Sequence, residues 1–435
     1  MELYAIKING WKNPMGFDYG VPQCSWKVRG NTGSRQETAR ILVGLDKTLQ
    51  KVIFQKEGNL NSLGEPLDFP LKPYTRYWYT IAVRSDHGEE AVSQPCFFET
   101  GKLDDPWKGQ WLGVEDGDTH PEFQKTFSLP EKPRSARLYI CGLGLFEAYL
   151  NGGKAGNDLL TPFLNDYTEH FQYCTYDVTS LLAQDNTLSV LLGDGWYRGH
   201  FGLGEPTHYE RPLALIAELC MEFADGHTET LRSDSGWQYR SSFTTLSDIY
   251  NGETQDYTKA SGDWKQPVLI PAPGRLCDRY SSPLHYMESI PVKEVIHTPA
   301  GETVLDFGQN FAGHVVCTQP IPNGTAMTLE FGEVLQNGNF YHENYRHAES
   351  KFTYVSDGIS REIRPRFTFF GFRYVKVSGL ERVDAACFEG RAIYSEMDRT
   401  GFIRTGNEKI NRLFSNSLWG LKSNFLDIPT DCPQR

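Results

Sequence analysis

Apolar residues recur at every second position in short segments up to about residue 400, and this period constrains the fold more than any other feature. The clearest segment runs from Leu213 to Phe223, where every second residue is apolar. Alternation is typical of a strand with one buried face, and the Asp225-Gly226 pair that follows predicts a hairpin turn. Similar segments recur at roughly ten-residue spacing with turn residues between them, which is typical of β-sandwiches. The sequence therefore predicts an all-β chain.

The strand segments fall into three groups, which predict three consecutive β-sandwich domains. The expected order is a fibronectin type III-like sandwich at 1–103, a linker at 104–121, a jelly-roll-like sandwich at 122–285 and a further β-sandwich at 286–398. The linker is assigned because its Gly, Pro, Asp and Lys content is typical of a connection. Its two tryptophans, Trp107 and Trp111, are expected to anchor it on a neighbouring domain.

A helical period appears only in the last segment, 399–435. Its apolar residues are spaced three or four apart, which indicates one face of an α-helix: Ile410, Leu413, Phe414, Leu418, Leu421 and Phe425. Thr405 and Glu408 stand at capping-box spacing, and Pro429 predicts that the helix ends by Ile428. A single helix of this length is marginally stable in water, so we expect it to pack on the third sandwich or on further helices.

Charge and cysteine content narrow the function classes. The net charge of −12 argues against nucleic acid and anionic membranes as partners. The nine cysteines are scattered singly, which indicates neither a disulfide framework nor a zinc cluster. The sequence has no apolar stretch of signal-peptide or membrane-spanning length, so a reducing cytoplasm is the expected compartment.

Two loops in the second domain combine aromatic and polar groups suited to a sugar, because aromatic faces stack on sugar C–H surfaces while charged groups bond hydroxyls. The loop 191–202 carries Asp194, Trp196, Tyr197, Arg198 and His200, and the loop 161–173 carries Asn165, Asp166, Tyr167, Glu169 and His170. The alternatives are a structural turn whose tryptophan covers the core and, for 161–173, a calcium site built from its oxygen atoms.

Other polar motifs favour structural roles. His342 and His347 are five residues apart rather than the four of a helical zinc-protease pair, so metal binding is not expected there. The DFGQN motif, Asp306 to Asn310, reads as a strand end that bonds a neighbouring loop. Four basic residues alternate with apolar ones and predict a solvated strand face: Arg361, Arg364, Arg366 and Arg373. The final DIPTDCPQR segment, taken by composition, fits an exposed terminus.

Several of these strings occur together, and in this order they resemble one family. GDGWYRG, DFGQNFAGHV, FGFRYVKVSG and NFLDIPTDCPQR follow one another as in bacterial α-L-rhamnosidases of glycoside hydrolase family 78. The resemblance covers essentially the whole chain. It implies that the jelly-roll is carbohydrate-binding-like and that 399–435 begin an (α/α)6 catalytic barrel.

The resemblance also implies a reaction. Family members remove terminal α-L-rhamnosyl groups with inversion, which needs an acid and a base about 6.5–9.5 Å apart. Both are expected beyond Arg435, so no catalytic residue is expected within the chain, which is read as an inactive N-terminal portion. Asp431 matches a family aspartate that bonds rhamnose, and Arg435 lies beside it. A rhamnosylated glycoside is the implied partner.

The second domain departs from the rhamnose-binding members of the family. Trp196 matches their stacking position, but Thr168-Glu169-His170 stand where an Asp/Asn pair is expected. Sugar and calcium binding there therefore stay open, and no other cofactor is expected. Two alternatives to the enzyme remain: a stand-alone rhamnose-binding module, and a scaffold that supports the barrel or forms a homodimer.

Overall fold

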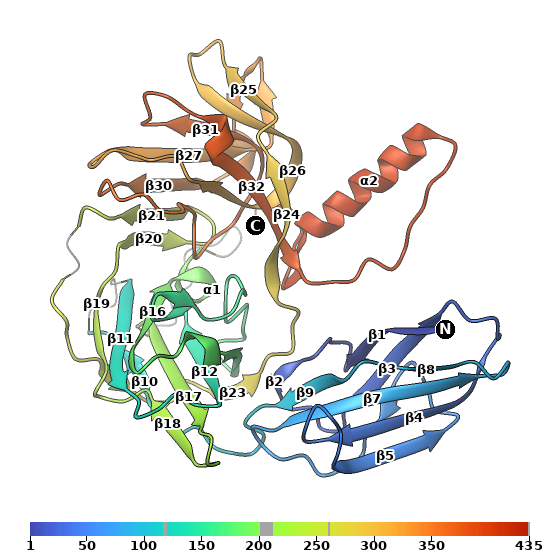
Figure 1. Ribbon diagram of the computed structural model, residues 1–435. Helices are drawn as coiled ribbons and strands as arrows, with labels where there is room; N and C mark the ends of the chain where they lie inside the picture. Colours follow the sequence, from blue (N-terminus) through green and yellow to red (C-terminus); the bar gives the residue numbers. More distant parts are fainter. Residues whose placement is uncertain (116–119, 201–211, 260–261, 434–435) are drawn as a thin grey trace. The chain divides into compact units, whose positions relative to one another are not determined.

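The computed structural model describes residues 1–115, 120–200, 212–259 and 262–433 and is built mainly of strands, as the sequence predicts (Figure 1). The chain divides into two compact units. One unit comprises Met1–Lys108 with Cys174–Tyr176, and the other comprises Gly109–Tyr173 with Asp177–Arg435. Within the described ranges, no helix is long and apolar enough to cross a membrane.

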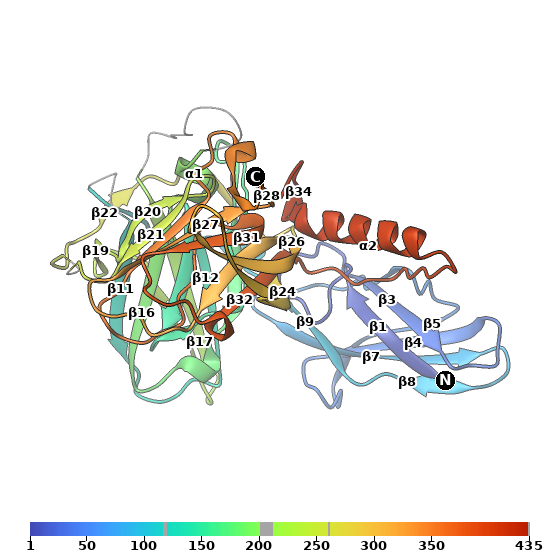
Figure 2. The same ribbon diagram turned by 90° about the horizontal axis from the view of Figure 1, so that it is seen from above.

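The first unit holds a sheet of three strands and a sheet of six (Figure 2). The small sheet has the order β1 (Glu2–Ile8), β3 (Gln23–Arg29), β6 (Glu65–Pro66). The large sheet has the order β2 (Met15–Phe17), β9 (Cys96–Thr100), β7 (Arg76–Ser85), β4 (Gln36–Gly44), β5 (Val52–Gly58), with β8 (Glu90–Val92) on β7. Alternate residues of β7, including Tyr77, Tyr79 and Ile81, are buried with Trp26 and Phe98 in its core. This unit carries the predicted first sandwich.

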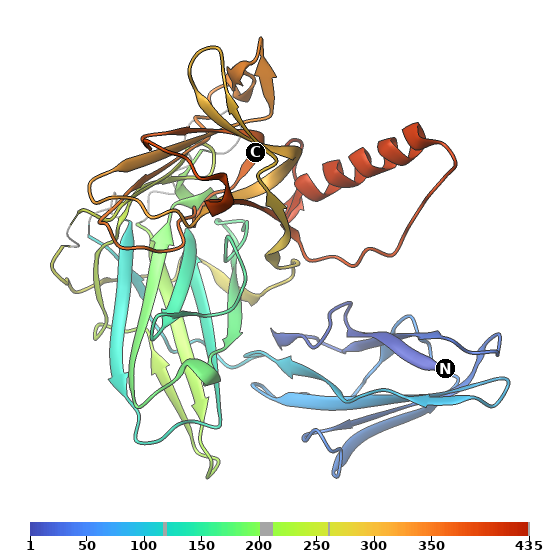
Figure 3. The same ribbon diagram turned by 45° about the horizontal axis from the view of Figure 1, so that its top comes forward.

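The second unit begins with a pair of sheets whose long strands run alongside one another (Figure 3). One sheet has the order β22 (Val268–Ile270), β10 (Trp111–Gly113), β17 (Ala214–Glu222), β12 (Ser135–Leu143), β15 (His170–Asp177), β23 (Arg275–Asp278), with β18 (Thr228–Arg232) on β17. The other has the order β14 (Gly153–Lys154), β13 (Leu145–Leu150), β16 (Asp185–Gly193), β11 (Pro121–Ser128), β19 (Gln238–Ser241). The short helices η1 (Thr179–Leu181) and α1 (Gly195–Arg198) connect strands.

Part of the expected linker is a strand of this domain. Trp111 and Leu112 lie in β10 and are 3% and 0% exposed, so their burial between β17 and β22 explains why the segment pairs. The hairpin at Asp225-Gly226 forms between β17 and β18, but only Gly226 has a positive φ (88°). The turn is therefore not of the type that needs positive φ at both central residues.

A nine-stranded sheet forms the rest of the unit. Its order is β20 (Thr244–Asp248), β21 (Gly252–Asp256), β30 (Lys351–Val355), β27 (Ala326–Gly332), β31 (Phe370–Ser378), β26 (Thr303–Cys317), β32 (Phe388–Ser395), β24 (Leu284–Pro291), with β25 (Glu294–His297) on β26. A hairpin of β28 (Val334–Gln336) and β29 (Asn339–Tyr341) turns at Asn337-Gly338, both with positive φ. Short helices η2 (Glu343–Tyr345) and η3 (Ala385–Cys387) complete it.

Two strands of this sheet come from the interval expected to form the jelly-roll. β21 pairs in parallel with β30, and β20 pairs with β21 (Figure 1). The interval 122–285 therefore supplies strands to the nine-stranded sheet as well as to the two sheets of the second domain. The core of the nine-stranded sheet is aromatic: the rings of Phe331 and Phe370 stack with centroids 3.9 Å apart, and Phe372 packs beside Phe331.

The helix α2 (Glu408–Ser423) forms where the apolar stripe predicts it and ends before Ile428 as predicted, but the predicted capping box at its start is wrong. Asn407 is the N-cap, because its side chain accepts hydrogen bonds from the Lys409 and Ile410 amides. The helix stops before Asn424, since the chain turns into a hairpin of β33 (Phe425–Leu426) and β34 (Ile428–Pro429). The Thr430 amide donates to the Asn424 carbonyl and closes this hairpin.

Candidate functional site

The hairpin after α2 is held by a buried carboxylate. Asp427 is 8% exposed, and its Oδ2 accepts a hydrogen bond from the Leu164 amide at 3.0 Å. Its own amide donates to Ser395 Oγ at 3.0 Å. The φ of Asp427 is 72°, a conformation that Asp adopts more readily than most residues. The loop 161–173 and the end of β32 therefore fix the hairpin between them.

The environment of Asp427 shifts its ionisation. Burial raises the pKa of this carboxyl, while Ser281, the Leu164 amide and the charge of Arg279 act in the opposite direction. A carboxyl group with a raised pKa is a candidate functional group, but structural groups show such shifts too. Its hydrogen bonds to the backbone of one loop and the end of one strand indicate a positioning role for Asp427.

Asp431 lies directly after this hairpin, two residues before Pro433. It is exposed, and the following Pro433 packs so closely on Gly371 that a Cβ atom there would collide with the proline backbone. The Tyr345 hydroxyl donates to the Gly371 carbonyl and fixes the same point of the strand. Arg346 Nη2 lies 4.0 Å from Cys432 Sγ. Arg435, the other sugar-binding residue that the resemblance implies, lies outside the described residues.

The segment from His342 to His347 contacts the same part of β31. Tyr345 is completely buried and holds β31. In the part of the chain that the structure describes, no three His, Cys, Asp or Glu side chains are grouped as metal ligands.

The GDGW tryptophan is packed inside the second domain. Trp196 and Tyr197 are 9% and 1% exposed in α1. Asp194 is engaged as well: its Oδ2 lies 3.2 Å from His120 Nε2 and its Oδ1 lies 3.5 Å from Arg198 Nε. A side chain at Gly195, whose φ is 54°, would collide with a neighbouring leucine, so this turn requires glycine. These groups form an internally bonded turn.

The loop 161–173 meets that turn through a buried ring. Tyr167 packs edge-on against Tyr197 with ring centroids 5.2 Å apart. Asp166 is exposed and accepts from Thr168, while His170 Nε2 lies 3.1 Å from the Tyr280 hydroxyl. Glu169 is exposed as well. The structure thus brings the two tyrosines together, and the predicted sugar contacts of both loops stay predictions.

The basic residues expected to form a solvated face do not form one. Arg364 and Arg366 have side chains 10% and 16% exposed and lie 2.8 Å and 2.5 Å from the carboxylate oxygens of Glu147 on β13. Tyr149 donates to the same carboxylate at 2.5 Å. The prediction is wrong because residues 361–366 pack against the second domain, where a partner carboxylate makes burial of the guanidinium groups tolerable.

The charges around Glu147 determine its ionisation. Burial alone raises the pKa of this carboxyl, but the charges of Arg364, Arg366 and Lys154 outweigh burial and hold the pKa well below its usual range. The sequence signal for this group is a lone carboxylate inside the apolar strand LFEAYL. Its two arginine partners lie more than 200 residues away, so the sequence did not identify them.

The DFGQN motif makes structural hydrogen bonds, as its sequence context favoured, but it lies inside β26 and not at a strand end as predicted. Asp306 accepts two hydrogen bonds of 2.8 Å from Arg373 on β31, and the Gly308 amide donates to the same carboxylate at 2.6 Å. Asn310 Nδ2 donates to Glu333 Oε1 at 2.9 Å. These bonds hold the turn at the register break between Asp306 and Phe311 in β26.

Four family models match successive parts of the chain. They are the Rha78A-like N-terminal immunoglobulin domain at residues 3–104, the alpha-L-rhamnosidase N-terminal domain at 131–284, the bacterial alpha-L-rhamnosidase concanavalin-like domain at 296–394 and the bacterial alpha-L-rhamnosidase 6 hairpin glycosidase domain at 398–435. The first model names an immunoglobulin domain where the sequence predicted a fibronectin type III-like one, and both are β-sandwiches.

Curated relatives match most of the chain. An α-L-rhamnosidase of Alteromonas sp. (strain LOR) is 31% identical over 99% of this chain and 51% of its own length. One of Streptomyces avermitilis is 36% identical over 72% of this chain and 32% of its own length. The chain thus spans at most about half the length of these curated relatives.

Solved structures agree on the fold. The α-L-rhamnosidase of Aspergillus terreus, 28% identical, superposes with a TM-score of 0.91 over 100% of this chain and 54% of its own. A Streptomyces avermitilis α-L-rhamnosidase solved with L-rhamnose, 23% identical, gives 0.90 over 100% of this chain and 61% of its own, which bears on the fold alone. The chain belongs to the α-L-rhamnosidases of glycoside hydrolase family 78, whose N-terminal β-domains and first six-hairpin segment it contains.

Proposed function

We propose that the chain is part of an enzyme that hydrolyses terminal α-L-rhamnosyl groups with inversion of configuration. The observation that carries this proposal is the unbroken order of four rhamnosidase family domains over residues 3–435. A rhamnosylated glycoside is the corresponding substrate.

Asp431 is the residue that we assign to the substrate. Its carboxylate is exposed, and the adjoining Pro433 is pinned on β31. A carboxylate accepts hydrogen bonds from sugar hydroxyls, and bonds to a charged group are stronger than bonds between neutral groups. Asp427 is a positioning residue, because its hydrogen bonds fix the hairpin that precedes Asp431.

The acid and the base are assigned to a part of the six-hairpin domain outside these residues. Inversion needs two carboxyl groups about 6.5–9.5 Å apart, with room for water on the far side of the sugar ring. The six-hairpin model matches only residues 398–435 here. We infer that these 435 residues alone do not turn over substrate.

The second and third domains serve as a support in this proposal. Asp194, Trp196 and Arg198 are engaged inside the second domain, which favours a structural role for that turn. The Glu147 ion cluster ties this domain to the third, on which α2 and the Asp431 segment rest.

Release of p-nitrophenol from p-nitrophenyl α-L-rhamnoside tests the assignment. It is measured on the 435-residue chain and on the same chain joined to a complete six-hairpin domain. We expect turnover by the joined protein only. Turnover by the shorter chain at a rate typical of a glycosidase contradicts its inferred inactivity. A joined protein that cleaves other aryl glycosides but not the α-L-rhamnoside contradicts the proposed activity.

A further inference from the structure

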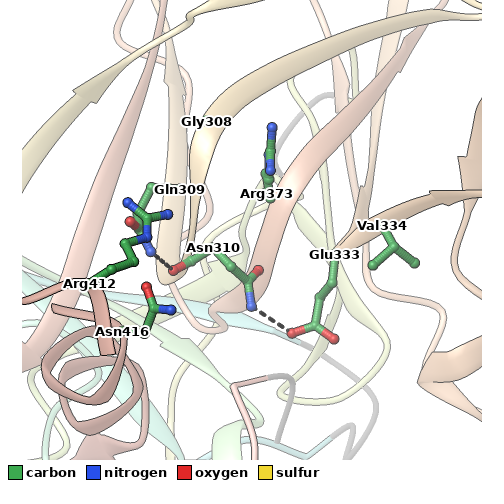
Figure 4. Close-up of a pocket in the computed structure, with 8 residues that line it drawn as sticks. All are labelled: Gly308, Gln309, Asn310, Glu333, Val334, Arg373, Arg412 and Asn416. Atoms are coloured by element: carbon green, nitrogen blue, oxygen red, sulfur yellow. Dashed lines mark hydrogen bonds between the residues drawn. The ribbon is translucent and has the colours of Figure 1, made fainter. Parts of the chain in front are cut away.

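A polar pocket of about 390 Å³ lies between α2 and the strands β26 and β31 of the nine-stranded sheet (Figure 4). This volume is within the range of small-molecule sites, about 300–1,000 Å³. The pocket is lined by Gly308, Gln309 and Asn310 of β26, Glu333 and Val334, Arg373 of β31, and Arg412 and Asn416 of α2. None of these residues belongs to the hairpin and loop that carry Asp427 and Asp431.

The sheet side of the pocket offers hydrogen-bond acceptors. Asn310 Nδ2 donates a hydrogen bond of 2.9 Å to Glu333 Oε1, and this bond holds the Asn310 side chain in one orientation. Its Oδ1 is buried and has no hydrogen-bond partner among the described residues. A buried acceptor without a partner is uncommon in proteins and is a reason to look for a ligand or water. Glu333 adds a carboxylate beside it.

The helix side offers donors. Arg412 and Asn416 are one turn apart on α2, so their side chains share a face of the helix. Figure 4 shows both projecting from the helix on the side of Gln309 and Asn310. The Arg412 guanidinium only donates hydrogen bonds, whereas the Asn416 amide both donates and accepts. Donors and acceptors thus face the same space from two elements.

The charges in the pocket balance. Arg373 is neutralised by its paired hydrogen bonds with Asp306, each 2.8 Å long. The remaining charges are one guanidinium, Arg412, and one carboxylate, Glu333. An anionic ligand is repelled by the carboxylate and a cationic ligand by the guanidinium, whereas an uncharged ligand meets neither penalty.

We propose that this pocket binds one neutral sugar unit. Sugar hydroxyls donate and accept at once, so one set of hydroxyls donates to Glu333 while another accepts from Arg412 and Asn416. The proposal goes beyond the hydrolysis of a rhamnoside, because the pocket is separate from the residues assigned to that reaction. It places a second saccharide-binding site between α2 and the third domain.

Isothermal titration of the 435-residue chain with single sugars tests the proposal. The probes are L-rhamnose and D-glucose as neutral sugars, D-glucuronate as an anion and D-glucosamine as a cation. We expect saturable binding of at least one neutral sugar, with a Kd at least fivefold lower than that of either charged probe. Absence of saturable binding by both neutral sugars, or tighter binding of a charged probe, overturns the proposal.

Variants locate the binding. Arg412→Ala and Asn416→Ala remove the donors from exposed positions of the helix, so neither is expected to disturb folding. Each is expected to raise the Kd at least fivefold. The matched control is Arg404→Ala, an exposed arginine outside the pocket, which is expected to leave the Kd unchanged. Unchanged binding in both pocket variants overturns the assignment and moves the sugar elsewhere, for example to loops 161–173 and 191–202.

Discussion

Glu147 brings a carboxylate into an otherwise apolar strand, and two guanidinium groups from a distant segment neutralise it there. Its distances of 2.8 Å and 2.5 Å to Arg364 and Arg366 join the second domain to the third. A buried ion pair contributes little net stability compared with an apolar replacement, but loss of one partner leaves an uncompensated buried charge. The cluster is therefore sensitive to single substitutions.

Glu147→Gln tests that sensitivity. Because two buried guanidinium groups lose their counter-charge, we expect the free energy of unfolding to fall by about 3 kcal/mol in urea denaturation. Glu362→Gln is the matched control, since Glu362 lies 3.7 Å from the same Arg364 but has a side chain 45% exposed. Exposed pairs contribute about 0–1 kcal/mol, so the control is expected to change little. Equal losses in both variants contradict the account.

His314 makes stability depend on pH. It is completely buried; its Nε2 donates to the Thr368 carbonyl at 2.6 Å and its Nδ1 accepts from the Tyr286 hydroxyl at 2.8 Å. Burial, together with the charge of Arg364, lowers the pKa of His314 to about 3. The unfolded chain, with a histidine pKa of about 6.5, then binds the extra proton first as the pH falls.

The stability that neutral His314 contributes is therefore present above about pH 6.5 and is lost as the pH falls towards 3. Between pH 7 and pH 5 we expect this group to remove about 2 kcal/mol from the free energy of unfolding. His314→Asn is expected to flatten the pH dependence over this interval by that amount. His297→Asn, at an exposed histidine, is the control. A slope that is the same in wild type and His314→Asn contradicts the lowered pKa.

Asp431 is expected to act on substrate. In the protein joined to a complete six-hairpin domain, Asp431→Asn replaces a charged acceptor by a neutral one. Loss of a charged hydrogen bond of about 2 kcal/mol lowers kcat/KM for an aryl α-L-rhamnoside roughly 30-fold. Glu408→Gln, at an exposed carboxylate in the first turn of α2, is the matched control. A wild-type kcat/KM in Asp431→Asn removes this residue from the site.

Among the elements, α2 shows both what the pattern predicts and what it misses. The apolar period placed the helix correctly, yet Leu413 and Leu421 of the stripe are 61% and 56% exposed. The contact with the nine-stranded sheet is made instead by Trp419, which packs on its core, and by Lys422, which pairs with Glu288. The period identifies an amphipathic helix but does not say which surface covers its apolar face.

The N-cap of α2 gives a test at this scale. Asn407→Ala removes the side chain that accepts from the Lys409 and Ile410 amides. Loss of such a cap costs about 1 kcal/mol, so hydrogen exchange of these two amides is expected to accelerate roughly fivefold. Ser415→Ala, in the middle of the helix, is the control. If Thr405→Ala accelerates the exchange of these two amides and Asn407→Ala does not, Thr405 and not Asn407 is the N-cap.

The capping example has a general cause. Thr405 and Glu408 have capping-box spacing, but Thr405 bonds the backbone of Asn407 and the side chain of Asn411 instead. Sequence spacing alone allows more than one residue near the start of the helix to be the N-cap. The extended backbone conformation at Asn407 makes this residue the N-cap. The end of the helix at Ser423 lies within the limit that Pro429 set, and the hairpin at Phe425–Pro429 fixes the residue at which it ends.

For the whole molecule, the sequence predicted the class and the family, whereas pairings between distant segments could not be predicted. Alternation and turn residues indicated the strands because those signals are local. The parallel pairing of β21 with β30 joins segments about a hundred residues apart, and nothing in either strand specifies its neighbour. Arg364 and Arg366 were misjudged for the same reason, since burial of a charge depends on a partner from elsewhere. The strings DFGQN and PTDCPQR indicated the family because each is specific and because they occur with the other strings in the family's order.

We propose that these domains belong to an inverting α-L-rhamnosidase, and the anomer first released from an aryl α-L-rhamnoside distinguishes inversion from retention. It is identified by ¹H NMR with the chain joined to a complete six-hairpin domain. The 435-residue chain alone is the control and is expected to release none. We expect β-L-rhamnose as the first product, because a water attacks from the face opposite the leaving group. Initial release of α-L-rhamnose, or no release of rhamnose by the joined protein, contradicts this proposal.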